Sequence, residues 1–308
     1  MKLTKEALGR IRGFVLRNGR PLEAALWRFH FEGGGAPDVL RALEPYQNPD
    51  GGFGHAVEPD LWNPQSTPYA TLHAATLLRA VGGANGPVLQ GILRYFRSGS
   101  AFENGRWLFT VPSNDLAPHA PWWRFDAETN ALESPGLTAA VAAFLLDAAE
   151  PGDSLYTLAA GIAEQTRRQL LQDDAGGEMF LDACLALLPH WARLCAPEEV
   201  QAARARMQAF VRKAVSHDPS EWAGYVPRPS RYIHSPESPF FSDNRTAVEQ
   251  ELDYLLQTLP EDDVWPINWS WFQNGETYLK AFAITENWAK ASAALDKLLF
   301  LRSFGRMA

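Results

Sequence analysis

The sequence predicts an all-α protein in which about six helical hairpins form a double ring. Segments bordered by Pro and Gly recur along the 308 residues, and none of them shows a convincing strand-like alternation. Segments that are apolar on nearly all sides also alternate with segments that keep one polar face. An all-apolar helix must be buried, whereas an amphipathic helix can face water, so this alternation predicts an inner ring wrapped by an outer ring.

The borders of these segments predict the helices individually. Several begin with a cap residue and a proline in the first turn, as at Thr67-Pro68 and Ser134-Pro135. The expected inner helices cover residues 67–82, 135–149 and 177–195, and the expected outer helices cover 86–97, 153–172 and 198–215. The remaining helices are expected at residues 3–17, 21–31, 36–46, 244–258 and 284–303.

One inner element departs from this plan. Residues 219–243 contain five prolines, a density that excludes an ordinary helix over most of the stretch. Composition does not divide the chain into halves, so we expect residues 1–308 to form a single domain with this one irregular segment. Cys184 and Cys195 are too far apart along one helix to form a disulfide.

The turns between the helices carry a repeated pattern. The sharpest copy is Gln47-Asn-Pro-Asp-Gly-Gly-Phe-Gly54, and weaker copies begin near Arg97, Gln172, His217 and Gln257. Asp-Gly-Gly supplies positive-φ positions at low cost, and a Gln amide can satisfy backbone groups at a helix end.

This turn resembles the glutamine–tryptophan repeat of squalene–hopene cyclases and the related repeat of protein prenyltransferase β-subunits. The chain also resembles small, uncharacterised bacterial toroid proteins through the segments Asp50–His55, Pro118–Trp123 and Trp265–Trp269. The resemblance implies the α/α toroid of the terpenoid cyclases and prenyltransferases, with a central cavity. It further implies an apolar or isoprenoid ligand, with cyclisation or isomerisation as the candidate reaction.

Two motifs of those families are missing from the chain. It has no Asp-x-Asp-Asp segment to protonate an alkene, and neither cysteine has a histidine at the spacing of a zinc site. The sequence therefore identifies no cofactor and leaves open whether the protein is an enzyme.

Charge and hydropathy narrow the classes of partner. The net charge of −8 and the dispersed Lys and Arg residues argue against general nucleic-acid binding. The N-terminus lacks the apolar core of a signal peptide, and the longest apolar run, Leu137 to Leu146, is too short to span a bilayer. We therefore expect a cytoplasmic protein without a membrane span, whose partner is a small molecule with apolar or sugar-like character.

Two loops concentrate the candidate catalytic side chains. His55, Glu58 and Asp60 follow the sharp turn, and Asp115 and His119 lie in a second, Pro-rich loop. Both loops precede apolar inner helices, so we expect them at the same end of the ring. Their carboxylates and imidazoles could supply a general acid and base or bind a divalent metal. The simpler interpretation is that they hold long loops in place, and their spacing does not identify a particular metal.

Tryptophans concentrate at the helix junctions. Trp107, Trp222 and Trp265 occupy repeat positions, and we interpret them as clamps of the turns. The candidate substrate-binding residues are the other junction tryptophans, together with a histidine on an apolar helix that could face the cavity: Trp62, His73, Trp122, Trp123, Trp269 and Trp271.

Three functions remain open from the sequence. The first is the apolar-ligand protein that the resemblance implies. The second is a carbohydrate-active helical barrel, which needs two of Glu58, Asp60 and Asp115 facing each other at about 5–10 Å. The third is a non-catalytic binding or scaffold protein that uses its loop aromatics to hold a partner.

Overall fold

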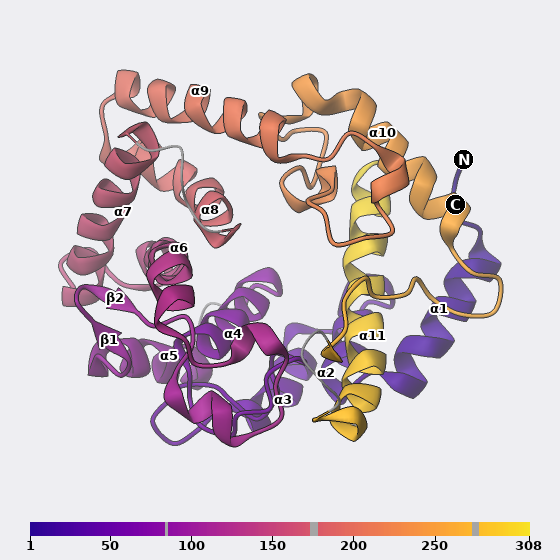
Figure 1. Ribbon diagram of the computed structural model, residues 1–308, viewed down its shortest axis with the longest axis horizontal. Helices are drawn as coiled ribbons and strands as arrows, with labels where there is room; N and C mark the ends of the chain where they lie inside the picture. Colours follow the sequence, from indigo (N-terminus) through magenta and orange to yellow (C-terminus); the bar gives the residue numbers. More distant parts are fainter. Residues whose placement is uncertain (84–85, 173–177, 273–276) are drawn as a thin grey trace. The chain divides into compact units, whose positions relative to one another are not determined.

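The computed structural model describes residues 1–83, 86–172, 178–272 and 277–308. In this part of the chain the protein is all-α apart from one short hairpin of two strands, β1 (Phe102–Glu103) and β2 (Arg106–Trp107). The α-helices are α1 (Lys5–Asn18), α2 (Pro21–Phe31), α3 (Ala36–Leu43), α4 (Pro68–Ala80), α5 (Pro87–Ser98), α6 (Ala127–Ala148), α7 (Ser154–Gln172), α8 (Glu178–Leu194), α9 (Pro197–Ala214), α10 (Phe241–Thr258) and α11 (Leu279–Ser303). Figure 1 shows their course along the chain.

The chain forms two compact units. The middle unit comprises residues 36–208, and the terminal unit comprises residues 1–35 together with 209–308. Each of the two units contains a cavity.

In the middle unit, α6 packs against both α4 and α8, and α7 packs against α5, α6 and α8. The three helices that the sequence assigns to an inner layer are therefore neighbours. Helices α4 and α6 bury just over half of their residues, and α8 buries the side that carries Cys184, Leu187 and Trp191. The closed double ring stays a prediction.

The terminal unit joins the two ends of the chain. Helix α1 packs against α2 and α11, and Leu3 pairs with Met307 in a parallel bridge. Helix α10 packs against two single 3₁₀ turns, η4 (Pro219–Glu221) and η5 (Pro229–Arg231). The proline-rich segment contains no α-helix before Phe241, as its proline content predicts.

The turn at Gln47 follows the 3₁₀ turn η1 (Glu44–Tyr46) that ends α3. The Gln47 Nε2 amide donates to the carbonyl oxygens of Gly51, at 3.0 Å, and Val88, at 3.1 Å. Gly51 has φ +94°, and the Asp50 carboxylate accepts a hydrogen bond from the Gly52 N–H. The Gln side chain thus ties the turn to the first turn of α5.

Two expected helix starts are wrong, since α11 begins at Leu279 rather than at residue 284. Pro135 lies inside α6 rather than in its first turn, because the helix begins at Ala127. Asp126 caps this start by accepting a hydrogen bond from the Thr129 N–H at 2.7 Å. The Ser134 hydroxyl accepts from the Phe109 N–H and is therefore not the helix cap.

Helix α6 is the one helix in the described residues that is long and apolar enough to cross a membrane, and 61% of its apolar window is buried inside the protein. A helix buried in the core of a protein can have the same length and apolar composition.

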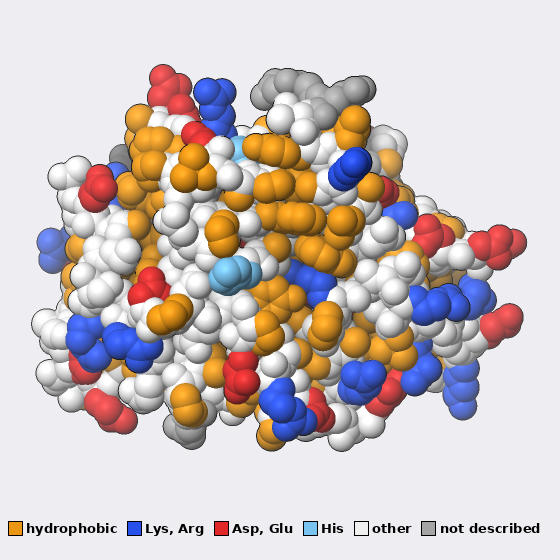
Figure 2. All heavy atoms as spheres, turned by 90° about the horizontal axis from the view of Figure 1, so that it is seen from below, with side chains coloured by type: hydrophobic (Ala, Val, Ile, Leu, Met, Phe, Trp, Pro, Cys, Tyr) orange, Lys and Arg blue, Asp and Glu red, His pale blue; other side chains and the backbone are white. Residues whose placement is uncertain are grey.

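Cys184 and Cys195 are free thiols. On the face shown in Figure 2, both basic and acidic side chains occur around hydrophobic ones.

Candidate functional site

The two loops with the candidate catalytic residues meet in the middle unit. Leu61 and His119 form an antiparallel bridge. On either side of it, the Trp62 N–H donates to the Pro118 carbonyl and the Ala120 N–H donates to the Asp60 carbonyl, both at 2.9 Å. The two loops are therefore in direct contact, and their place at one end of a ring stays a prediction.

Two buried asparagines that the sequence analysis did not single out hold these loops together. Asn63 Nδ2 donates to Asn114 Oδ1 at 2.9 Å and to the Ser113 hydroxyl at 2.8 Å. Asn114 Nδ2 donates in turn to the Trp123 carbonyl at 2.9 Å. Both amides are buried, so each lost hydrogen bond would leave a desolvated polar group behind.

The three candidate carboxylates have different surroundings. Glu58 Oε2 lies 3.4 Å from His73 Nδ1, which makes this pair a possible acid–base couple. Asp115 Oδ1 accepts the Phe125 N–H at 2.9 Å and lies 4.0 Å from His119 Nε2. The Asp60 side chain is buried.

The two loop histidines contact the backbone and amides of their own loops. His119 Nδ1 lies 2.7 Å from the Ala117 carbonyl oxygen, and His55 Nε2 lies 2.9 Å from Asn48 Oδ1. Across the described ranges, no three His, Cys, Asp or Glu side chains gather as they would around a metal ion. These contacts favour the interpretation that the histidines hold the loops.

We expect His119→Ala to lower the free energy of unfolding by about 1 kcal/mol, because it removes a hydrogen bond beside the junction of the two loops. His55→Ala is the matched comparison, since His55 is exposed, and it should cost less than about 0.5 kcal/mol. Urea denaturation of both variants measures the difference. Equal stabilities of His119→Ala and the unchanged protein would contradict the loop-holding role.

The candidate tryptophans differ in their environment. Trp123 is buried and packs against Tyr69 and Phe109, with ring centroids 4.3 and 5.0 Å apart. Trp271 is also buried and packs against Phe282. Trp62 and Trp122 are half-buried in the loops, and the Trp62 indole donates to the Pro59 carbonyl. Trp269 lines the larger cavity described below.

A cavity of about 300 Å³ lies between the three neighbouring helices of the middle unit. His73 and Thr76 of α4 line it, with Phe144 of α6 and Asp182 of α8. The Glu58–His73 pair therefore has one member in a cavity wall. A role of His73 in binding a substrate in the central cavity of a ring stays a prediction.

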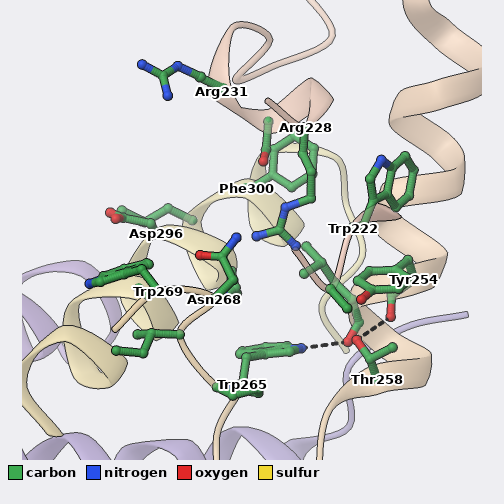
Figure 3. A pocket seen from close by; sticks show the side chains of 18 of the residues that line it. Trp222, Arg228, Arg231, Tyr254, Thr258, Trp265, Asn268, Trp269, Asp296 and Phe300 are labelled. Atoms are coloured by element: carbon green, nitrogen blue, oxygen red, sulfur yellow. Dashed lines mark hydrogen bonds between the residues drawn. The ribbon is translucent and has the colours of Figure 1, made fainter. Parts of the chain in front are cut away.

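A larger cavity, of about 710 Å³, lies within the terminal unit (Figure 3). Its walls come from the proline-rich segment, the end of α10, the segment before α11, and α11 itself. Five aromatic residues line it: Trp222, Tyr254, Trp265, Trp269 and Phe300. Its size and aromatic lining are those of a small-molecule site.

Hydrogen bonds hold two of the aromatic walls in place. The Trp265 indole donates to the Leu255 carbonyl at 2.8 Å, and the Trp222 indole donates to the Ser216 carbonyl at 3.2 Å. Trp222 also packs edge-on against Tyr254 at 5.4 Å. Both tryptophans thus clamp loops, as the sequence indicates, and both line the cavity as well, which the sequence analysis did not foresee.

A buried carboxylate organises one charged side of this cavity. Glu251 is 1% exposed and accepts hydrogen bonds from the Ser230 N–H at 2.7 Å and the Ser230 hydroxyl at 2.6 Å. Arg228 Nε lies 3.6 Å from Glu251 Oε1. Figure 3 shows the Arg228 guanidinium directed towards Asn268, whereas the Arg231 guanidinium points away from the other lining residues.

Helix α11 adds two neighbouring charged residues to the same wall, Asp296 and Lys297. Burial and the nearby Arg228 lower the pKa of Lys297, Asp296 and Glu251 partly offset these effects, and the resulting pKa is about 8. The Asp296 side chain has accessible surface, yet the surrounding protein desolvates its carboxyl, and this burial raises its pKa. Burial likewise raises the pKa of Glu251.

The sequence does not single out most of the charged residues of this cavity. One signal is present: Asp296-Lys297 is an adjacent charged pair within the otherwise uncharged run from Ala291 to Leu301. The proline-rich segment that supplies Arg228 carried no such signal, because its path depends on its packing against α10.

Comparison with known proteins adds no assignment, since no family model, no curated protein and no solved structure matches this chain.

Proposed function

We propose that the protein binds a small molecule with an apolar, isoprenoid-like body in the aromatic cavity of the terminal unit. The observation that carries this proposal is the 710 Å³ cavity with its five aromatic lining residues. Ligand sites in proteins are usually concave, mostly apolar and furnished with a few polar groups that orient the ligand. Asn268, Arg228 and the α11 pair supply such groups.

The aromatic walls suit an apolar chain better than a sugar. Trp265 and Trp222 are buried and fixed by indole hydrogen bonds, so their rings lose little conformational freedom when a ligand binds. Rings of this kind gain contact area with alkyl and isoprenoid groups, and their faces also attract positive charge that develops on a ligand.

The same proposal includes the α/α toroid as the architecture. The contacts of α6 with both α4 and α8, and of α5 with α7, support an inner and an outer layer of helices in the middle unit. The turn at Gln47, with its amide bound to Gly51 and Val88, is compatible with the glutamine–tryptophan repeat.

The carbohydrate-active alternative receives less support from the middle unit. Glu58 approaches His73, Asp115 accepts a backbone N–H, and Asp60 is buried, so each carboxylate has a separate environment. The Glu58–His73 pair remains the observation that favours acid–base chemistry there, at the 300 Å³ cavity.

Binding of citronellol, an isoprenoid alcohol, tests the proposed function. We expect saturable quenching of tryptophan fluorescence, and we expect Trp269→Ala to raise Kd at least about tenfold, since a lost aromatic contact of 1.4 kcal/mol has that effect. Trp62→Ala is the control, because Trp62 lies in the loops of the middle unit. Absence of saturable binding, or an equal loss of citronellol affinity in Trp269→Ala and Trp62→Ala, would refute the proposal.

A further inference from the structure

Asp296 and Lys297 are adjacent on α11, and both line the aromatic cavity. Within the described residues, neither side chain makes a hydrogen bond or an ion pair. Lys297 Nζ instead lies 5.7 Å from the centre of the Trp265 ring. A half-buried amine without a carboxylate partner is unusual, because buried charges in proteins are normally paired.

The charged groups around Lys297 come from three elements. The segment around η5 contributes Arg228, Arg231 and His234, α10 contributes Glu251, and α11 contributes Asp296. Glu251 is engaged by Ser230 and by Arg228. Burial disfavours the protonated Lys297 amine, and the adjacent Arg228 adds a like charge, so together they favour the neutral amine against the opposing effect of Asp296 and Glu251.

We propose that Lys297 is a nucleophile that forms an imine with an apolar aldehyde or ketone bound in this cavity, with Asp296 as the proton donor. The inference rests on the proposed function, because it takes the same cavity as the ligand site. It adds the carbonyl group to the ligand class and a covalent step to binding.

The step is balanced without a further reactant. The lone pair of Lys297 Nζ attacks the carbonyl carbon, and the displaced electron pair of the C=O bond takes a proton from Asp296 at the oxygen. Nitrogen then loses a proton to the Asp296 carboxylate. Asp296, protonated again, then protonates this oxygen, which leaves as water while the nitrogen lone pair forms the C=N bond. The iminium returns its N–H proton to the Asp296 carboxylate, so that amine and carbonyl give imine and water with no change in oxidation state.

The lowered pKa makes this step accessible near neutral pH. With a pKa of about 8, roughly one Lys297 side chain in ten is neutral at pH 7, compared with roughly one in a few thousand for an ordinary lysine. A lysine that is desolvated beside another cation is an established way to activate an amine. The raised pKa of Asp296 favours the protonated form that the step needs.

Reductive trapping tests the inference. The full-length protein is incubated with citronellal, an isoprenoid aldehyde, and sodium cyanoborohydride at pH 7, and the modified peptides are identified by mass spectrometry. We expect Lys297 to be labelled at least tenfold faster than Lys290, and the rate to rise with pH with a midpoint near 8. Lys290 lies on the same helix but is paired with Asp263, at 3.3 Å.

Variants and competition separate the cavity amine from other amines. Lys297→Arg should abolish labelling of this peptide, Lys290→Arg should leave it unchanged, and Asp296→Asn should slow it at least tenfold. Lys297→Met provides a second variant that keeps the side-chain volume. Excess citronellol should protect Lys297 but not the exposed α-amino group of Met1, which is also reactive at this pH.

Two results would overturn the inference: equal labelling of Lys297 and Lys290, or a Lys297 labelling midpoint above pH 10. If citronellol binds while Lys297 stays unlabelled, the imine step is wrong and the proposed function stands. If Lys297 reacts with acetaldehyde but citronellol does not bind, the lysine is activated as inferred and the apolar ligand is wrong.

Discussion

Replacing Gly51 with alanine is expected to lower the free energy of unfolding by at least about 3 kcal/mol. A Cβ atom at this position would lie 2.1 Å from the carbonyl oxygen of Gly91 in α5, and Gly51 has φ +94°. The clash is with backbone, so it cannot be relieved by rotating a side chain. Relief requires the Gln47 turn to move away from α5. Urea denaturation followed by circular dichroism measures the loss.

Gly82→Ala is the matched control for this substitution. Gly82 has φ +69° and ends the segment after α4, but nothing lies within 4 Å of an added Cβ. It therefore carries the backbone strain without the clash, and we expect a loss of only about 1 kcal/mol. Equal losses in the two variants would show that the close approach of the turn to α5 does not contribute to stability.

Lys297→Met is expected to stabilise the protein at pH 7 by about 2 kcal/mol. The pKa of Lys297 is about 8 in the folded protein and about 10.4 in the unfolded chain, and each pKa unit corresponds to about 1.4 kcal/mol. The full shift corresponds to about 3 kcal/mol, and solvent screening of the half-buried side chain reduces this to about 2 kcal/mol. Met removes the buried charge and retains the apolar stem.

The pH dependence of this gain follows from linkage. Between pH 8 and about 10.4 the unfolded chain binds the Lys297 proton and the folded protein releases it, so the stability of the unchanged protein rises with pH. The stability gained at high pH, where Lys297 is neutral, is lost again as pH falls through 8. The advantage of Lys297→Met should therefore be full below pH 8 and vanish above about pH 10.5. Thermal unfolding at a series of pH values tests this window.

Lys290→Met serves as the control on the same helix. Lys290 pairs with Asp263 at 3.3 Å and with Glu286 at 3.7 Å, so its removal should cost less than about 1 kcal/mol and bring no gain at pH 7. A loss of stability in Lys297→Met at pH 7 would identify Lys297 as a structural residue. A gain would mean that the protein retains a destabilising amine in the aromatic cavity, as functional sites commonly do.

Most helices could be predicted from the sequence because their signals are local. Pro, Gly and cap residues border them, and their apolar periodicity distinguishes buried from amphipathic helices. The start of α6 is an informative exception. Pro135 resembled a helix start, but the Asp126 cap begins α6 a full two turns earlier, and burial among α4, α7 and α8 compensates for a proline within the helix.

The candidate sites likewise combine features that the sequence predicts with features that depend on tertiary packing. The loops at 55–62 and 115–123 are predicted from the chain alone to carry polar side chains, and residues 219–243 to be irregular. The hydrogen bond that joins those loops through Asn63 and Asn114, and the approach of Arg228 to Lys297, arise from tertiary contacts that no local pattern indicates. Local signals specify helices and turns, because they act between neighbours in the chain. A cavity depends on residues that are distant in sequence, and its charge balance and pKa values exist only once packing excludes water from them.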